Sequence, residues 1–218
     1  MELLTGRGGV EFDRPRRFQE WAGAGFFAAL WEAGLAGYDE LTGIDWAWQA
    51  VDGVMTKTPV GGAASWPNAM ERTKRGIKRS LLTVGAGIPL AVADDGANRH
   101  DMRPLAATLD GGTGARPSPT AAVPPHLCLD AGYNYADVRD EAAARGDEAH
   151  IHGRGEERAA KDRVPGWRAW RWVVERTYSW MYRCRRLLLR WENTAENYLA
   201  FVHLACAQLI FSKNVVSG

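Results

Sequence analysis

Residues 79–96, RSLLTVGAGIPLAVADDG, predict a β-hairpin. Two apolar runs, 80–84 and 89–93, are joined by a turn containing Gly-Ala-Gly, the kind of residue that tight hairpin connections require. The stretch WAWQAVDGVMT at 46–56 alternates between faces, with its tryptophans and alanine on one side, which is typical of a strand. Strands that follow one another this closely indicate the antiparallel part of a sheet.

Helices and strands then alternate, which favours parallel crossovers after the antiparallel strands. The predicted fold class is therefore α/β, a mixed sheet flanked by helices. The expected elements are helices at 15–41, 101–109, 135–146, 167–190 and 194–212, strands at 126–130 and 148–152, a loop at 57–78, and a flexible linker at about 111–124.

The composition is that of an ordinary soluble globular protein, with 46% hydrophobic and 24% charged residues among 218. A net charge of +1 excludes a generic polyanion binder, so such binding would have to come from local basic clusters. The three cysteines form no pairing pattern, which favours a reducing compartment. The first residues lack a signal peptide, and the apolar run at 198–211 is too short for a membrane span. We expect a cytoplasmic protein with no membrane contact.

Three acids are candidate ligands of a metal ion. Asp52 and Asp130 each close an apolar strand, and Glu175 is the one acid within the aromatic, arginine-rich stretch 169–190. Carboxylates at the ends of buried strands are rigidly held oxygen ligands, and two or three of them can bind a pair of Mg²⁺ ions. If they act together, the three carboxylates must meet in the folded chain.

Structural alternatives exist for each acid. An Asp beside Gly after a strand is most often a turn residue, and Glu175 has Arg171 one helical turn away as an ion-pair partner. His150 and His152 have a metal-like spacing but no third ligand in the sequence, so they are interpreted as strand residues. The acids that compete for the same role are Asp45, Asp94, Asp95 and Asp101.

Several blocks of the sequence together resemble the DDE transposases of bacterial insertion sequences, over roughly residues 10–212. The blocks are AVDGVMTKTPVGG (50–62), NAMERTKRGIKRSLLT (68–83), GIPLAVADDGANRHD (87–101), LCLDAGYNYADVR (127–139) and RWVVERTYSWMYRCRRLLLRWENTAENYLAFVHLACA (171–207). The resemblance implies a ribonuclease-H-like catalytic domain. It also implies that Asp52, Asp130 and Glu175 are the catalytic, metal-binding acids.

The same resemblance implies two Mg²⁺ ions, or Mn²⁺, and double-stranded DNA at the element ends and the target. It further implies a homo-oligomer on DNA in the bacterial nucleoid. It suggests a residual helical region at 1–44, a catalytic domain at 45–193 and a C-terminal helix and tail at 194–218. The expected DNA-binding residues are Lys74, Arg75, Lys78, Arg171, Arg176 and Arg183.

Two hypotheses of different class follow. The first is a transposase that cleaves and joins DNA strands, from an N-terminally truncated or frameshifted copy, because the family commonly begins with a longer helical region. The second is a catalytically silent remnant that regulates by binding DNA or an intact transposase. The three acids favour the first hypothesis, and the short N-terminal region favours the second.

Overall fold

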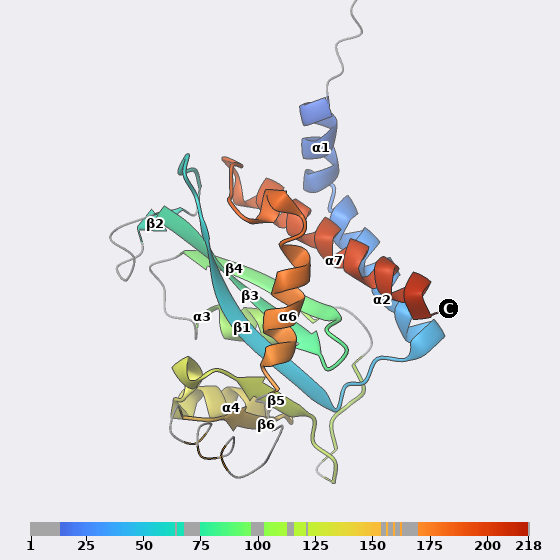
Figure 1. Ribbon diagram of the computed structural model, residues 1–218, viewed down its shortest axis with the longest axis vertical. Coiled ribbons are helices and arrows are strands. Elements are labelled where there is room, and N and C mark those ends of the chain that lie inside the picture. The colour runs from blue at the N-terminus through green and yellow to red at the C-terminus, as the bar shows by residue number, and fades with distance from the viewer. Residues whose placement is uncertain are drawn as a thin grey trace, which may run out of the picture.

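Strands β1 (Trp48–Lys57), β3 (Arg75–Val84) and β4 (Pro89–Gly96) form the antiparallel part of one sheet (Figure 1). The predicted hairpin is confirmed, with Ser80 of β3 opposite Ala93 of β4. The computed structural model describes residues 14–63, 65–67, 75–96, 103–112, 116–120, 122–153, 156, 159, 162 and 170–217.

The parallel part of the sheet continues from the other side of β1. Strand β5 (His126–Leu129) pairs parallel to β1, and β6 (Glu148–Ile151) pairs parallel to β5. The sheet runs β3, β1, β5, β6, and both β4 and the short β2 (Trp66–Pro67) pair with β3. The predicted mixed sheet is thus confirmed, and its order is that of a ribonuclease-H-like fold.

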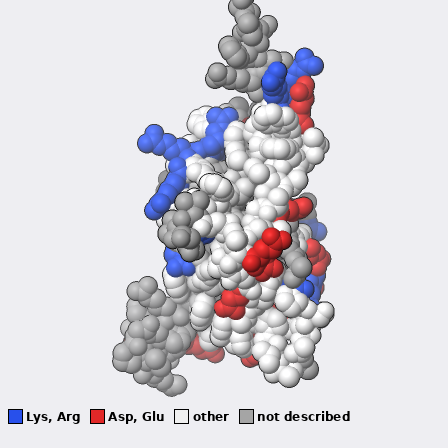
Figure 2. Space-filling model, turned by 90° about the vertical axis from the view of Figure 1, so that its right-hand side faces the viewer, with Lys and Arg blue, Asp and Glu red and all other residues white. Residues whose placement is uncertain are grey.

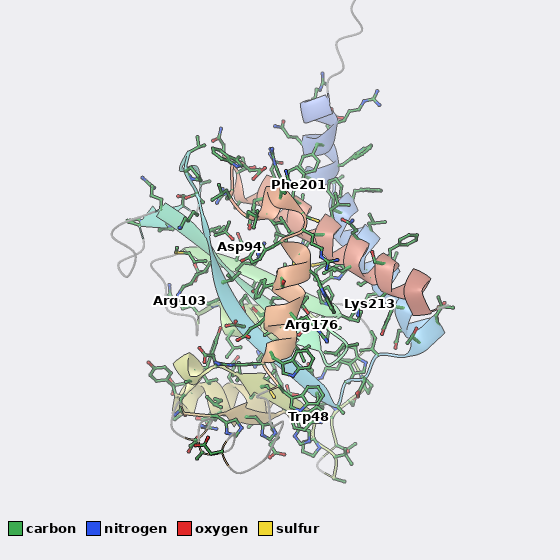
Figure 3. All side chains as sticks on the ribbon, in the orientation of Figure 1. Trp48, Asp94, Arg103, Arg176, Phe201 and Lys213 are labelled. Carbon is green, nitrogen blue, oxygen red and sulfur yellow. The ribbon has the colours of Figure 1, made fainter. Side chains whose placement is uncertain are left out.

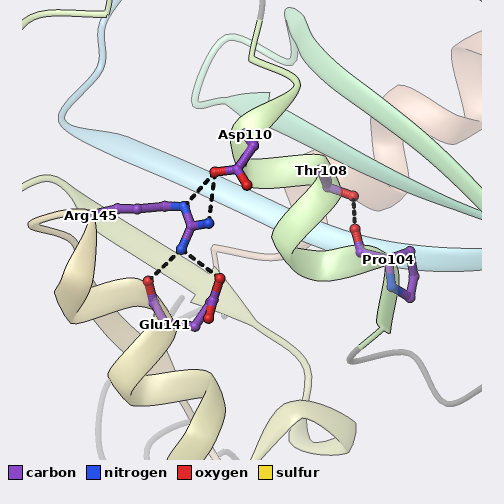
Figure 4. Close-up of polar contacts among 5 residues, drawn as sticks. All are labelled: Pro104, Thr108, Asp110, Glu141 and Arg145. Atoms are coloured by element: carbon purple, nitrogen blue, oxygen red, sulfur yellow. Dashed lines mark hydrogen bonds and ion pairs between the residues drawn. The ribbon is translucent and has the colours of Figure 1, made fainter.

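Helices cover the sheet on both sides (Figure 1). Helix α6 (Trp172–Met181) crosses in front of β1 and β3, while α3 (Arg103–Asp110) lies behind and α4 (Ala136–Ala144) packs at β6. Arg145 joins α3 and α4, because its guanidinium contacts Asp110 of α3 at 2.7 Å and Glu141 of α4 at 2.7 Å (Figure 4). This bridge fixes the two crossover helices relative to each other.

Helices from opposite ends of the chain lie side by side next to the sheet. Helix α2 (Phe26–Thr42) packs along α7 (Ala195–Ser217), and α1 (Arg14–Gly23) precedes α2 (Figure 1). Trp31 of α2 donates to the carbonyl of Pro89 on β4 at 3.2 Å. None of the helices among the described residues is long and apolar enough to cross a membrane.

A buried arginine ties α7 to the sheet. Arg79 of β3 is 0% exposed and donates to the Tyr198 hydroxyl at 2.9 Å. That hydroxyl donates in turn to Thr56 of β1 at 3.0 Å, and the guanidinium also lies over the ring of Tyr178. A buried cation is tolerated only with such partners, so this cluster holds α6, α7 and the sheet together.

Three sequence predictions need correction. The helix expected at 15–41 is two helices, because Gly25 adopts the left-handed φ of 71° between them. The helix expected at 167–190 ends at Met181, and Leu189 instead forms a parallel bridge with Lys57. The loop expected at 57–78 contains β2 and the first part of β3.

Candidate active site

The register of the parallel strands brings two of the predicted acids together. Val51 pairs with Leu129, so Asp52 lies beside Asp130, the residue that follows β5. The sequence prediction that Asp52 closes its strand is wrong, because β1 continues to Lys57 and Asp52 pairs with Leu81 of β3. Alternation along the strands puts both side chains on the same face of the sheet. Each carboxylate accepts the backbone N–H of the following residue at 2.7 Å, which fixes its orientation.

Glu175 reaches this strand edge from helix α6 through Arg171. Arg171 donates a hydrogen bond to Asp130 Oδ1, and its Nε lies 3.7 Å from Glu175 Oε1. One guanidinium therefore contacts two of the three acids. The Arg171–Glu175 ion pair, which the sequence offered as the structural alternative for Glu175, is present. Arg171 also pairs with Asp130.

The position of α6 is fixed close to Asp52. The Tyr178 hydroxyl lies 3.0 Å from the carbonyl oxygen of Asp52 and 2.8 Å from that of Arg79. The preceding residue, Thr177, donates to the carbonyl of Gly87 at 3.1 Å. These contacts set the height of Glu175 above the sheet, because the helix cannot slide without breaking them. Nothing in the sequence had marked Tyr178 for this role.

The electrostatic environment raises the pKa of Asp52 to about 6. Burial is the main cause, since it disfavours the charged form, and the negative charges of Asp130 and Glu175 raise the pKa further. The N–H of Gly53 and the charge of Arg171 act in the opposite direction. The three acids thus share one electrostatic environment, as groups that hold a common cation do.

The competing acids lie elsewhere. Asp94 and Asp95 are on β4, which is separated from β1 by β3 (Figure 3 labels Asp94). Asp45 precedes β1 and accepts the backbone N–H of Ala47 at 3.0 Å, as a turn residue does. Asp101 lies outside the described residues. Among the described candidates, Asp130 and Glu175 both contact Arg171, and the charges of both act on Asp52.

The predicted DNA-binding residues fall in different surroundings. Arg75 and Lys78 lie on β3 rather than on a loop, and Arg75 donates to the carbonyl of Ser65 at 3.0 Å. Lys74 lies outside the described residues. Arg183 is exposed just after α6.

Arg176 is held among aromatic rings on the α7 side of α6. Its guanidinium lies 4.3 Å from the ring centre of Trp172 and 4.7 Å from that of Trp180. Lys213 of α7 lies over the same Trp180 ring at 4.3 Å (Figure 3). Arg171, as described, is engaged by carboxylates. The sequence had indicated the Arg171–Glu175 pair but neither the contact of Arg171 with Asp130 nor the aromatic partners of Arg176.

The face that carries α2 and α7 is unevenly charged (Figure 2). Lys and Arg side chains gather at one edge, beside a broad uncharged area. Exposed residues after α6, Arg183, Arg185 and Arg186, supply local positive charge although the whole chain carries only +1.

The donor set suits a hard divalent cation. Three carboxylates offer the oxygen ligands that Mg²⁺ and Mn²⁺ prefer. Asp52 stands within β1 and Asp130 directly after β5. With Asp130 43% exposed and Glu175 56% exposed, the acids also have open sides for water or a substrate oxygen. The residues therefore fit the metal pair that the resemblance implies.

The order of its mixed sheet defines the chain as a ribonuclease-H-like α/β protein. Residues 49–210 match the family model described as the transposase DDE domain. The chain is 32% identical over 155 residues to the transposase assigned to insertion sequence element IS402 of Burkholderia cepacia, covering 70% of this chain and 71% of that one. The chain belongs to the family of DDE-domain transposases of insertion sequences.

Two solved assemblies are more distantly similar. A piggyBac transposase synaptic complex with hairpin DNA matches with a TM-score of 0.46 and 10% identity over 78% of this chain. A simian T-cell lymphotropic virus intasome, bound to the PP2A regulatory subunit B56 gamma, matches with a TM-score of 0.40 and 12% identity over 72% of this chain. This chain spans about half the length of each of those chains, 48% in both cases.

Proposed function

We propose that this transposase cleaves DNA strands and joins them to a target in a metal-dependent reaction, with Asp52, Asp130 and Glu175 as the catalytic acids. The observation that carries the proposal is that Arg171 contacts both Asp130 and Glu175, while Asp52 lies beside Asp130 in the register of β1 with β5. Family membership supports the same chemistry.

The three acids would hold two Mg²⁺ ions, or Mn²⁺. When bound, such a pair activates water or a 3′ hydroxyl and stabilises the leaving oxygen in displacement at phosphorus. The chain itself holds Asp52 and Asp130 in fixed orientations through their backbone hydrogen bonds, and it fixes the level of Glu175 through Tyr178. Such rigidity matters because catalysis depends on placing groups to within a fraction of an ångström.

Arg171 has a separate task in this proposal. In the metal-free protein its positive charge offsets the repulsion between Asp130 and Glu175. Cations held by these carboxylates would supply the same offset, and the Arg171 guanidinium would then be positioned to bind a phosphate of the DNA strand, for which its fork of donors is well suited.

The proposed partner is double-stranded DNA, namely the element ends and the target, bound by a homo-oligomer. Arg75, Lys78 and Arg183 would supply phosphate contacts at the strand and loop edges, and Lys74 completes the proposed set. Phosphate contacts position a duplex without reading its sequence, so these residues would orient the strand and not select the site.

Nicking of labelled element-end DNA tests the proposal. The purified chain is incubated with Mg²⁺ or Mn²⁺ beside Asp52→Asn, Asp130→Asn and Glu175→Gln. Glu40→Gln, at an exposed acid on α2, serves as the matched control. We expect metal-dependent nicking that drops at least about 100-fold in each of the three site variants and is unchanged in the control.

The outcomes separate the two hypotheses. Nicking that persists in the three site variants would refute the assignment of the acids. DNA binding that weakens as salt rises, without nicking by the unsubstituted chain, would instead support a silent regulator, because counterion release governs such binding regardless of catalysis.

A further inference from the structure

A second group of ligand-type side chains lies at the opposite end of the parallel strands. His126 begins β5, and in the parallel register it stands directly opposite Glu148 at the start of β6, with His150 two residues further on. Their ligand atoms, two imidazole nitrogens and a carboxylate oxygen, all lie within 4.8 Å of one another. His126 precedes Asp130 by four residues on the same strand, so the two groups are roughly 13 Å apart.

The separations within this group match those of a metal coordination sphere. His126 Nδ1 lies 2.8 Å from His150 Nε2 and 3.5 Å from Glu148 Oε2, and His150 Nε2 lies 3.9 Å from Glu148 Oε1. Zinc–nitrogen bonds of about 2.0–2.1 Å at tetrahedral angles put neighbouring ligand atoms roughly 3.3 Å apart. The observed values bracket this figure, so small rotations of the side chains would complete the geometry.

Aromatic rings hold the histidines in place. Trp48 of β1 stacks on His126 with 4.2 Å between ring centres and lies 5.3 Å from His150 (Figure 3). Trp170 in turn stacks on Trp48, with 5.0 Å between the ring centres. The two histidine side chains are only 30% and 26% exposed, whereas Glu148 is 55% exposed. The imidazoles are therefore pre-oriented, and the carboxylate side is open to an entering ion.

We propose that His126, Glu148 and His150 bind a transition-metal dication, with Zn²⁺ as the intended ion. Two imidazole nitrogens select Zn²⁺, Cu²⁺ or Ni²⁺ over Mg²⁺, which prefers oxygen ligands. Three protein ligands leave one position for water. The ion joins β5 to β6 and lies against Trp48, whose ring stacks on Trp170, the residue before Arg171. It thereby stiffens the entry to α6, independently of the proposed nuclease chemistry.

A metal-free arrangement is the competing explanation. One neutral histidine can donate to the other at 2.8 Å, with Glu148 accepting a further hydrogen bond, and such a pair needs no ion. The two explanations differ in one measurable respect, which is Zn²⁺ affinity in an excess of Mg²⁺.

Zn²⁺ binding is measured on the untagged full chain by competition with a chromogenic chelator, in excess Mg²⁺ to occupy the acidic site. We expect one Zn²⁺ per chain and a higher Tm with Zn²⁺. Affinity should fall more than about 100-fold in His126→Gln and in His150→Gln, because even the hydrogen-bond partners of metal ligands change affinity by about 10–100-fold. His203→Gln on α7 is the matched control and should bind as the unsubstituted chain does.

Three results would overturn the proposal. These are no Zn²⁺ binding by the unsubstituted chain, binding that survives both histidine substitutions, and binding that is lost in the double variant Asp52→Asn, Asp130→Asn. Glu148→Gln provides a milder variant should a histidine variant misfold. The Co²⁺-loaded chain adds an independent readout, since its visible spectrum distinguishes a four-coordinate nitrogen site from six-coordinate oxygen ligation.

Discussion

Asp52 is a carboxylate whose placement opposes folding. It lies partly buried on β1, close to Tyr178 of α6 and with two other acids nearby. Its pKa is raised to about 6. An acid whose pKa is higher in the folded than in the unfolded chain binds protons more tightly when folded, so its ionisation destabilises the fold. Such strain is common where a protein keeps charges for function.

Asp52→Asn is expected to stabilise the metal-free protein in a pH-dependent way. The folded chain retains the Asp52 proton between pH 4 and about 6 while the unfolded chain has lost it, so the stability of the unsubstituted protein falls across that window. Asp52→Asn lacks this loss, so its free energy of unfolding should exceed that of the unsubstituted protein by about 1–3 kcal/mol at pH 7. At pH 4 the two free energies should be nearly equal.

Urea unfolding from pH 4 to 7 with a chelator present measures this difference. Asp110→Asn, at an acid of the α3–α4 bridge, is the control for a general effect of removing a negative charge. An advantage of Asp52→Asn that grows toward acid pH would contradict the raised pKa.

The strand-end position of Asp130 could be predicted from the sequence, because it directly follows the apolar run of β5. The position of Asp52 could not, because the apolar run stops there whereas pairing with β3 continues β1 to Lys57. The histidine group could not be predicted either. His126 and His150 are separated by α4 and the turns on either side of it, and only the register of β5 with β6 brings them together. Arg79 directly follows Lys78 in the sequence, and its tyrosine partners lie about a hundred residues away in the chain.

Among the elements, the β3–β4 turn and α6 depend on each other. Gly87 in that turn has φ 78°, and a Cβ there would lie 2.8 Å from the Trp180 ring and 3.0 Å from Thr177 Oγ1. The turn thus requires glycine both for its backbone conformation and for the close approach of α6. The hairpin fixes the helix that carries Glu175.

Gly87→Ala is expected to destabilise the protein by about 2–4 kcal/mol, because backbone strain of about 1–2 kcal/mol adds to a steric clash with α6. Gly25→Ala is the matched control. It has a similar φ of 71° with no heavy atom within 4 Å of the added Cβ, so it should cost only the strain. Equal losses in urea unfolding would show that α6 tolerates the added methyl group.

The sequence predicted elements well where the pattern was local. The hairpin at 79–96 needed only two apolar runs and a glycine turn. The end of α6 was missed because residues 182–190 have a helical composition, whereas tertiary contacts take them elsewhere. Arg190 is 0% exposed. Its backbone N–H donates to the carbonyl oxygen of Lys57 at 2.9 Å, and its Nε donates to the carbonyl oxygen of Glu192 at 3.0 Å. An arginine buried in this way cannot be distinguished from a surface arginine in one sequence.

At the scale of the whole molecule, a net charge of +1 makes DNA binding depend on a few local contacts. We expect Arg183→Gln to reduce the slope of log Kd against log salt by about 0.9, the value for one lost phosphate contact. Arg139→Gln on α4, whose side chain bonds to Asn134, should leave the slope unchanged. Filter binding of an element-end duplex at several salt concentrations measures both slopes. An unchanged slope in Arg183→Gln would remove this residue from the proposed interface.

The division into 1–44, 45–193 and 194–218 stays a prediction. The structure adds one relevant fact, which is that residues of α2, the sheet and α7 belong to the same buried cluster, including Leu35, Leu81 and Val202. Cutting the chain at 44 or 194 would expose part of that cluster. Excised segments are therefore poor substitutes for the full chain in any assay.

The pairing of α2 with α7 also sets the order of events during synthesis. Trp31 and Leu35 leave the ribosome early, but the helix that covers them begins at Ala195. Until that helix emerges, the nascent chain carries an uncovered aromatic and aliphatic surface of the kind that chaperones bind. The core can therefore close only after α7 has emerged, and a ribosome stalled before residue 195 would hold a chain whose core lacks this helix.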